Sequence, residues 1–263
     1  MNMDYQTIQV EIDSRGVAYL VLNRPEKHNA MNAELIAEVT RAANDLDKND
    51  DVRAVVLTGA GKSFCAGGDL KWMQGLCDAT REGRFNDSAN IFRMLQALKH
   101  LSKPLIGRIN GQAFGGGTGM MSVCDITIAV STGKYALTET RLGLIPANIS
   151  KFVVEKMGLS NARRTFLNAL PLTASDAKEF NLVDKVVEPD DLDAAVEQEI
   201  EHLLLCGPKA VADTKKMIFY VNSHSEEDCL TYVGNMLADT WESEEGQEGI
   251  RSFFAKDKPN WRG

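Results

Sequence analysis

The sequence of 263 residues predicts an α/β fold. The runs 52–58 and 126–130 are almost continuously apolar, which is typical of strands that are buried on both faces of a parallel sheet. Other segments carry apolar residues at the spacing of an amphipathic helix, as 91–101 does. Strands that alternate with helices in this way indicate a sheet covered by helices.

Each predicted element rests on its own local pattern. Alternating residues mark a strand at 17–23, and Asn32 is expected to cap a helix with Leu35, Ile36 and Val39 on one face. Lys103-Pro104 is expected to end the helix at 91–101, and the polar stretch 80–90 is expected to be a loop. The further expected strands are 104–109 and 183–187. Two further helices are expected to begin near Trp72 and near Met120. The other expected helices are 152–157, 162–170, 175–180, 192–205, 208–220, 226–241 and 245–256.

From Ser150 onward the predicted elements are almost all helices, so we expect two parts. Residues 1–190 would form the α/β core with the functional site, and residues 191–263 would form a helical C-terminal region. The C-terminal helices carry too many apolar residues for a solvated appendage. We therefore expect them to pack on another subunit.

The bulk properties argue against several classes of protein. A net charge of −8 disfavours broad nucleic-acid binding, and no apolar run approaches the ~20 residues that span a bilayer. The first five residues lack the basic and apolar regions of an export signal. The five cysteines are widely spaced and form no C-x-x-C pair, which favours reduced thiols over disulfides or a zinc site. We expect a cytoplasmic protein without a bound metal.

Two glycine turns each follow a strand and precede a helix: Ala66-Gly67-Gly68 and Gly115-Gly116-Gly117. The second does not continue as a dinucleotide fingerprint, and Gly61-Lys62-Ser63 lacks the first glycine of a phosphate-binding loop. Without a Cβ, the backbone N–H groups of the turns are accessible to a ligand oxygen. If both turns face one point, they would form an oxyanion hole for an acyl or thioester carbonyl. The alternative is that the glycines only let helix and strand pack closely.

Glu139 is the strongest candidate for an acid or base. It is expected to close an apolar strand and to precede an apolar loop, where burial would raise the pKa of its carboxyl and suit it to proton transfer. The alternative is a surface carboxylate paired with Arg141. Cys65, beside the first glycine turn, is a weaker candidate as a nucleophile because no histidine lies near it in sequence.

The chain resembles the crotonase, or enoyl-CoA hydratase/isomerase, superfamily over essentially its whole length. The resemblance lies in the order and spacing of the stretches 22–31, 64–70, 110–117, 124–126, 139–146 and 258–261. It implies a spiral of ββα units with a C-terminal helical trimerisation region, assembled as a homotrimer or as a hexamer of two trimers. It also implies an acyl-CoA substrate, in which coenzyme A is part of the substrate and no separate cofactor is needed.

The resemblance further assigns roles to individual residues. The amides of Gly68 and Gly116 would hold the thioester oxygen, and Glu139 would transfer the proton. The contacts to coenzyme A would come from Arg24, Lys27 and His28 on a first loop and from Ala66, Gly68, Asp69, Leu70 and Lys71 on a second. Arg24, Lys27 and Lys71 would supply the positive charge that phosphates need in an acidic protein.

One position departs from the family pattern. Two-carboxylate hydratases of the family carry a first glutamate two residues after the third glycine, where this chain has Gly119. The two-glutamate mechanism therefore does not carry over. Asn148 and Ser150 are candidates for holding the water instead, and the alternative is that they cap the following helix.

The combination of Gly119, the stretch 139–147 and Ile149-Ser150 resembles the bacterial methylglutaconyl-CoA hydratase branch, which favours hydration of a short branched or carboxylated enoyl-CoA. A second carboxylate on the substrate would need a cation, and Arg141 is near in sequence. A Δ3,Δ2-enoyl-CoA isomerase that uses one carboxylate is an alternative. A catalytically weak acyl-CoA binding protein is another.

Overall fold

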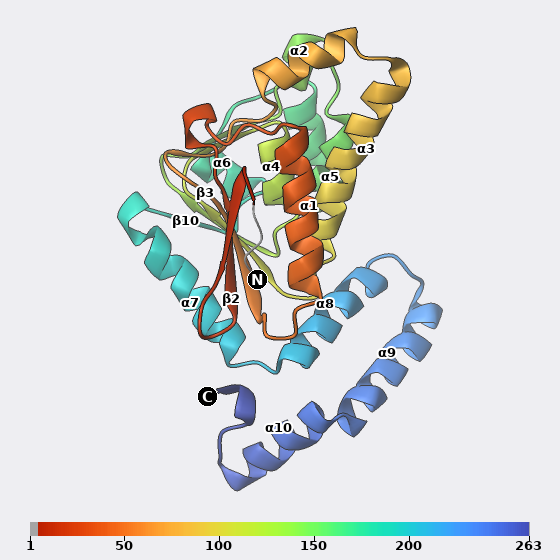
Figure 1. The fold of residues 1–263 in the computed structure, drawn as a ribbon. Coiled ribbons are helices and arrows are strands. Elements are labelled where there is room, and N and C mark those ends of the chain that lie inside the picture. The colour runs from red at the N-terminus through yellow and green to blue at the C-terminus, as the bar shows by residue number, and fades with distance from the viewer. Residues whose placement is uncertain (1–4, 263) are drawn as a thin grey trace.

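The computed structural model describes residues 5–262, and its strands form two sheets (Figure 1). The segment 1–4, on which the expectation about an export signal largely rests, lies outside the described residues. In spatial order, the strands of the larger sheet are β1 (Ile8–Ile12), β2 (Val17–Leu22), β3 (Ala54–Gly59), β5 (Leu105–Ile109), β7 (Ile126–Val130) and β10 (Lys185–Val187). Those of the smaller sheet are β4 (Ser63–Cys65), β6 (Gln112–Phe114), β8 (Lys134–Ala136) and β9 (Leu172–Thr173).

The larger sheet is parallel from β2 to β10, as the apolar runs predict. Every residue of β3 is buried, because both faces of the sheet are covered. Sequence reasoning missed β1, which pairs antiparallel with β2 at the edge of the sheet. Most residues of β1 are not buried, so it lacks the apolar run that marks the inner strands.

Pairs of strands followed by a helix repeat along the chain, and this confirms the predicted ββα units. β3 and β4 lead to α2 (Leu70–Asp78), and β5 and β6 lead to α4 (Gly116–Ser122). β7 and β8 lead to a 3₁₀ turn (Glu139–Leu142) and then to α5 (Ala147–Phe166). Because β4, β6 and β8 are parallel neighbours, the loops that follow them lie at one edge of the smaller sheet.

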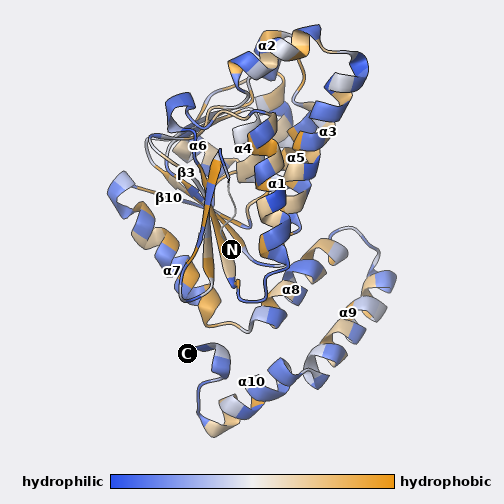
Figure 2. Ribbon diagram, in the orientation of Figure 1, coloured by the Kyte–Doolittle hydropathy of each residue, from blue (hydrophilic) through white to orange (hydrophobic). Residues whose placement is uncertain are grey.

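Apolar clusters lie on both faces of the larger sheet. Val55 and Leu57 of β3 belong to the major cluster, which the sheet shares with α1 (Ala33–Asp47), α3 (Arg81–Lys99), α4 and α5. Val56 points the other way, into a smaller cluster with Val196 and Ile200 of α7 (Leu192–Leu204). Figure 2 shows the resulting pattern, with apolar colour on the strands and mixed colour on the covering helices.

The prediction of a loop at 80–90 is wrong, because α3 begins at Arg81. The hydroxyl of Thr80 caps this helix by accepting a 3.0 Å hydrogen bond from the amide of Gly83. Its first half contributes no buried residue, and burial starts only at Ile91. The polar composition therefore reflects a helix that extends beyond the core and not a break in the helix.

The four C-terminal helices begin and end within one residue of their predicted bounds; after α7 they are α8 (Pro208–Val221), α9 (Glu226–Glu242) and α10 (Glu244–Ala255). The predicted helices 152–157 and 162–170 are one helix, α5, bent at Gly158, and the predicted helix 175–180 is α6 (Ala174–Glu179). The ammonium of Lys215 on α8 donates to Asp125 over 2.6 Å, which holds α8 to the core. Within residues 5–262, no helix is long and apolar enough to cross a lipid bilayer.

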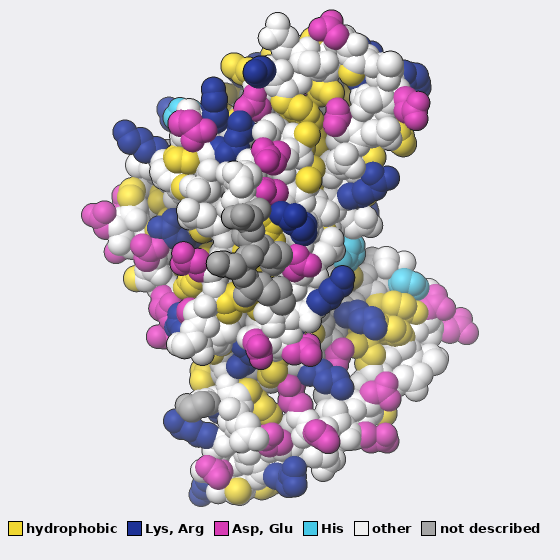
Figure 3. Space-filling view, in the orientation of Figure 1, with side chains coloured by type: hydrophobic (Ala, Val, Ile, Leu, Met, Phe, Trp, Pro, Cys, Tyr) yellow, Lys and Arg dark blue, Asp and Glu magenta, His cyan; other side chains and the backbone are white. Residues whose placement is uncertain are grey.

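Helices α9 and α10 extend away from the sheets and contribute no buried residue (Figure 1). Apolar side chains are visible among charged ones over this part of the molecule (Figure 3). The exposed large apolar residues of α8 to α10 are Ile218, Val221, Leu230, Leu237, Trp241, Ile250, Phe253 and Phe254. The division at residue 190 and the trimerisation role of this region stay predictions.

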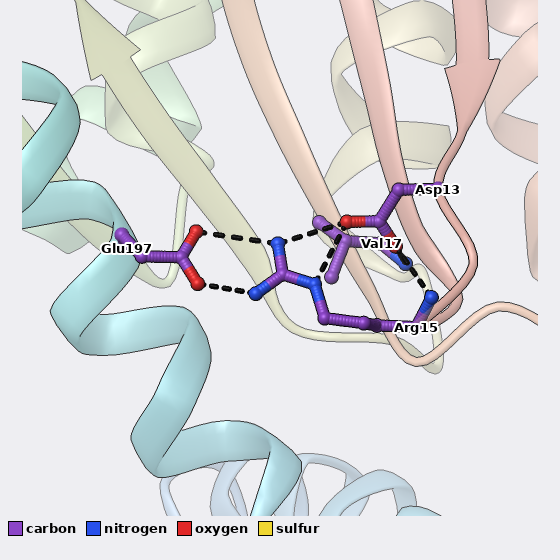
Figure 4. Close-up of polar contacts among 4 residues, drawn as sticks. All are labelled: Asp13, Arg15, Val17 and Glu197. Atoms are coloured by element: carbon purple, nitrogen blue, oxygen red, sulfur yellow. Dashed lines mark hydrogen bonds and ion pairs between the residues drawn. The ribbon is translucent and has the colours of Figure 1, made fainter.

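Arg15 links the turn between β1 and β2 to α7 (Figure 4). Its guanidinium donates to both carboxylate oxygens of Glu197 and, over 2.8 Å, to Asp13. Asp13 also accepts the amide of Val17 over 3.0 Å, which fixes the turn itself. These charges are well exposed to solvent, so we expect the contact to orient α7 while adding little to stability.

Candidate active site

One cavity of about 280 Å³ brings together the two glycine turns and the predicted acid. It lies where the loops after β4, β6 and β8 meet. Most of its wall is apolar. The lining residues are Met31, Ala66, Gly67, Gly68, Leu70, Trp72, Met73, Leu76, Ile91, Phe114, Gly115, Gly116, Thr138, Glu139, Leu142 and Leu144.

The first glycine turn follows β4 and is held against Met31. The amide of Met31 donates to the carbonyl of Gly67 over 2.7 Å, and the amide of Asp69 donates to the carbonyl of Met31 over 2.8 Å. Gly67 has a φ of +93°, which favours glycine at this bend. The two bonds to Met31 do not use the amide of Gly68, which stays available to a ligand in the cavity.

The second glycine turn follows β6, and its glycines have different roles. Gly116 is the first residue of α4, so its N–H has no acceptor within the helix. Gly117, in contrast, is packed so closely that a Cβ would lie 2.4 Å from the carbonyl oxygen of Cys65. Gly117 therefore allows close packing, whereas Gly116 lines the cavity, and its role in holding a ligand oxygen stays a prediction.

Glu139 lies in the 3₁₀ turn after β8 and not at the end of the strand itself. One carboxylate oxygen, Oε2, is buried and has no hydrogen-bond partner within residues 5–262. Burial raises the pKa of this carboxyl, as predicted. A surface pair with Arg141 does not form, because the guanidinium of Arg141 donates instead to the carbonyl of Ala169 over 2.9 Å.

Gly119, at the position of the family's first glutamate, does not line the cavity. It is buried on α4 against α5. A Cβ at this position would lie 2.5 Å from Cγ2 of Ile149 and 3.4 Å from Cδ1 of Leu95. The chain therefore lacks the first carboxylate and also has no space for it.

The two residues suggested as holders of a water lie elsewhere. Asn148 accepts a hydrogen bond from Ser88, and Ser150 donates to the carbonyl of Ala147 over 2.8 Å, both in the first turn of α5. Neither residue lines the cavity. Thr138 does line it, and sequence reasoning missed this residue. Its position beside Glu139 is the one sequence signal that could have indicated it.

The residues assigned to coenzyme A fall into three groups, one of which is the pair of Arg24 and Asp69. Ala66, Gly68 and Leu70 line the cavity, and Leu70 is 84% exposed. Lys27, His28 and Lys71 are exposed and do not line it. His28 contacts the hydroxyl of Ser63 over 3.0 Å. The roles of these residues in binding coenzyme A stay predictions.

Arg24 and Asp69 join the two loops. The guanidinium of Arg24 donates to the Asp69 carboxylate over 2.9 Å and also to the carbonyl of Ala30. The same carboxylate caps α2 by accepting the amides of Lys71 and Trp72. Burial would raise the pKa of Asp69, but the hydrogen bonds from Arg24 and from these amides outweigh it, so the pKa is lowered. Both residues thus have a structural role.

Arg24→Met is expected to lower the free energy of unfolding by about 1–3 kcal/mol, because it leaves a mostly buried carboxylate without its charged partner. Lys27→Met is the matched control, since Lys27 is an exposed basic residue on the same loop. This variant should unfold within about 0.5 kcal/mol of the wild type. Urea unfolding measures both. Equal stability of the two variants would contradict the structural role of Arg24.

Cys65 is not suited to act as a nucleophile. Its side chain is fully buried, and burial raises the pKa of its thiol to about 12. A thiolate would therefore be scarce at neutral pH. Within the described part of the chain, no group of three or more His, Cys, Asp or Glu could hold a metal ion.

Known proteins resemble this chain over nearly its whole length. The enoyl-CoA hydratase/isomerase family model matches residues 13–263. Enoyl-CoA hydratase AKT6-1 of Alternaria alternata is 32% identical over 259 residues, which cover 92% of this chain and 84% of that protein. A crystal structure of an enoyl-CoA hydratase from Shewanella pealeana has a TM-score of 0.94 and 34% identity, covering 98% of this chain and 96% of that one. Pseudomonas aeruginosa AtuE has a TM-score of 0.95 and 33% identity, covering 98% and 100%.

Proposed function

Because the chain belongs to the enoyl-CoA hydratase/isomerase family, we propose that it adds water across the 2,3 double bond of an enoyl-CoA. The observation that carries this proposal is that Gly68, Gly116 and Glu139 line one cavity. Two backbone donors and one desolvated carboxyl are the groups that thioester enolate chemistry needs.

In the proposed mechanism, the amides of Gly68 and Gly116 donate to the thioester oxygen. Their hydrogen bonds strengthen as negative charge develops on that oxygen. Glu139, in its ionised form, removes a proton from water while the water oxygen bonds to C3. The π electrons of the double bond move into an enolate, which then takes a proton from Glu139 at C2. The first step leaves Glu139 protonated, and the second returns it to its ionised form, so the complete cycle leaves the enzyme as it began.

For the acyl group, we propose a short branched chain, and the cavity wall supports an uncharged one. Apart from Glu139, none of its lining residues is charged. A substrate carboxylate of the methylglutaconyl type would lie near Glu139 without a counter-ion from this wall, which is costly in a desolvated site. Arg141, the cation considered for that purpose, contacts Ala169 instead.

The proposal is tested by measuring water addition to crotonyl-CoA, 3-methylcrotonyl-CoA and 3-methylglutaconyl-CoA. We expect the uncharged substrates to have a higher kcat/KM than the carboxylated one. A preference for 3-methylglutaconyl-CoA would show that a cation of the protein pairs with the substrate carboxylate. It would support the alternative of a carboxylated acyl group. The absence of water addition to all three would exclude the hydratase function.

A second candidate function is Δ3,Δ2-enoyl-CoA isomerisation, and one observation favours it. Glu139 is the single carboxylate among the residues that line the cavity. One carboxyl is enough to move a proton between C2 and C4 through the same enolate. Incubation with a 3-enoyl-CoA in H₂¹⁸O distinguishes the two reactions, because isomerisation conjugates the double bond without incorporating oxygen from water.

We also propose that the chain forms a homotrimer or a hexamer of two trimers in the cytoplasm. The exposed apolar residues of α8 to α10 support the assembly, since large exposed apolar surfaces mark sites of association. The five unpaired cysteines fit a reducing compartment. Sedimentation equilibrium of the purified protein tests the assembly, and a monomeric mass would exclude it.

A further inference from the structure

Glu139 lacks the partner carboxylate that two-carboxylate hydratases use to hold the attacking water. Among the residues that line the cavity, only Thr138 and Glu139 have a side-chain oxygen. Trp72 offers an indole N–H, which donates but cannot accept a hydrogen bond. A water that gives both of its hydrogens to side-chain oxygens of this wall must therefore use Thr138 and Glu139.

The hydroxyl of Thr138 is available to accept a hydrogen bond from this water. It forms no hydrogen bond to any of residues 5–262. It is also not fully buried, so solvent reaches it. Nearby threonines are engaged in the fold. Thr118 donates to the carbonyl of Ala113 over 3.2 Å, and Thr140 donates to the carbonyl of Phe166 over 3.2 Å.

Glu139 also has a side-chain oxygen without a hydrogen-bond partner within residues 5–262. Its Oε2 is buried without a partner, and a buried carboxylate oxygen normally has one. Two consecutive residues in one cavity thus each carry an oxygen that the protein leaves unpaired. Because both residues line the cavity, we take one water there as the shared partner of the two side chains.

We propose that Thr138 positions the attacking water, an inference that rests on the hydratase function proposed above. The water donates one hydrogen to Glu139 and the other to the hydroxyl oxygen of Thr138, so a lone pair of the water faces C3. As the bond from oxygen to C3 forms, the first hydrogen passes to Glu139 as a proton and the second stays on the product hydroxyl. Thr138 keeps its own proton throughout and is a positioning residue.

Thr138→Val removes the hydroxyl while keeping the shape of the side chain. We expect it to lower the kcat for hydration about 10- to 100-fold with little change in KM, the loss typical of a hydrogen bond to a reacting group. Thr138→Ser keeps a hydroxyl and should retain most of the activity. Thr140→Val is the matched control, because the hydroxyl of Thr140 bonds to Phe166 and not into the cavity.

The decisive measurement is exchange of the C2 protons of butyryl-CoA with D₂O. Exchange needs Glu139 and the oxyanion hole but no attacking water. Thr138→Val should therefore lower the ratio of hydration to exchange, while Thr140→Val leaves that ratio unchanged. The ratio does not depend on how much of the variant is folded. An equal loss of both reactions in Thr138→Val, or full hydration by this variant, would overturn the inference. A wild type that exchanges but does not hydrate would instead refute the proposed function.

Discussion

Glu139→Gln is expected to lower the kcat for hydration by about 10²- to 10⁴-fold, the usual contribution of a general acid or base. The amide has almost the size of the carboxyl but cannot take a proton from water. Affinity for a saturated acyl-CoA should change little, because the amides of Gly68 and Gly116 and the apolar wall remain. Steady-state kinetics and calorimetric titration with butyryl-CoA measure the two effects.

Glu82→Gln provides the control, since Glu82 is an exposed carboxylate on α3 that does not line the cavity. It should leave both turnover and binding unchanged. Unchanged turnover in Glu139→Gln would show that another group transfers the proton. A wild type that binds butyryl-CoA but catalyses neither hydration nor isomerisation would support the acyl-CoA binding alternative.

The same variant is expected to change how stability depends on pH. Burial raises the pKa of Glu139 in the folded protein, so the folded state binds this proton more tightly than the unfolded chain does. The wild type therefore loses stability as pH rises from the unfolded pKa of ~4.3 through the raised folded value. Gln does not titrate. In urea unfolding at several pH values, the free energy of unfolding of Glu139→Gln should rise relative to that of the wild type across that window. A difference that does not change with pH would contradict the expectation.

The features that sequence reasoning predicted are those decided by local pattern. Inner strands such as β3 are buried on both faces, so apolar composition alone marks them. Asn32 accepts the amide of Leu35 over 2.9 Å, as the expected cap should. Glu139 was found because an acid between apolar segments indicates burial. In each case neighbours in the chain determine the environment.

The features that it missed depend on contacts between distant residues. Three strands of the smaller sheet, β4, β6 and β9, are two or three residues long, too short for a periodic pattern to mark them. The pair of Arg24 and Asp69 joins residues 45 positions apart. Thr138 stands beside Glu139 in sequence, but only the fold shows that its hydroxyl is free while that of Thr140 is bonded. No pattern in a single sequence separates these two threonines.

Gly119→Glu restores the glutamate of two-carboxylate hydratases and is expected to destabilise the fold by ~4 kcal/mol or more without raising activity. Its Cβ would lie 2.5 Å from Ile149, so α4 and α5 would have to separate. The carboxylate would then enter apolar surroundings beside Leu95 with no counter-ion, which adds the cost of burying a charge. Urea unfolding and hydration of crotonyl-CoA measure the two effects.

Gly75→Glu is the matched control for this change. Gly75 is also a helical glycine, but no atom lies within 4 Å of the position of its Cβ. Here the substitution should be neutral or stabilise by up to about 1 kcal/mol, because Glu has the higher helix propensity. If Gly119→Glu were as stable as Gly75→Glu and also more active, α4 and α5 would have room for a second carboxylate facing the water. The water would then not need Thr138, and close packing of α4 on α5 would not explain why this chain lacks the family's glutamate.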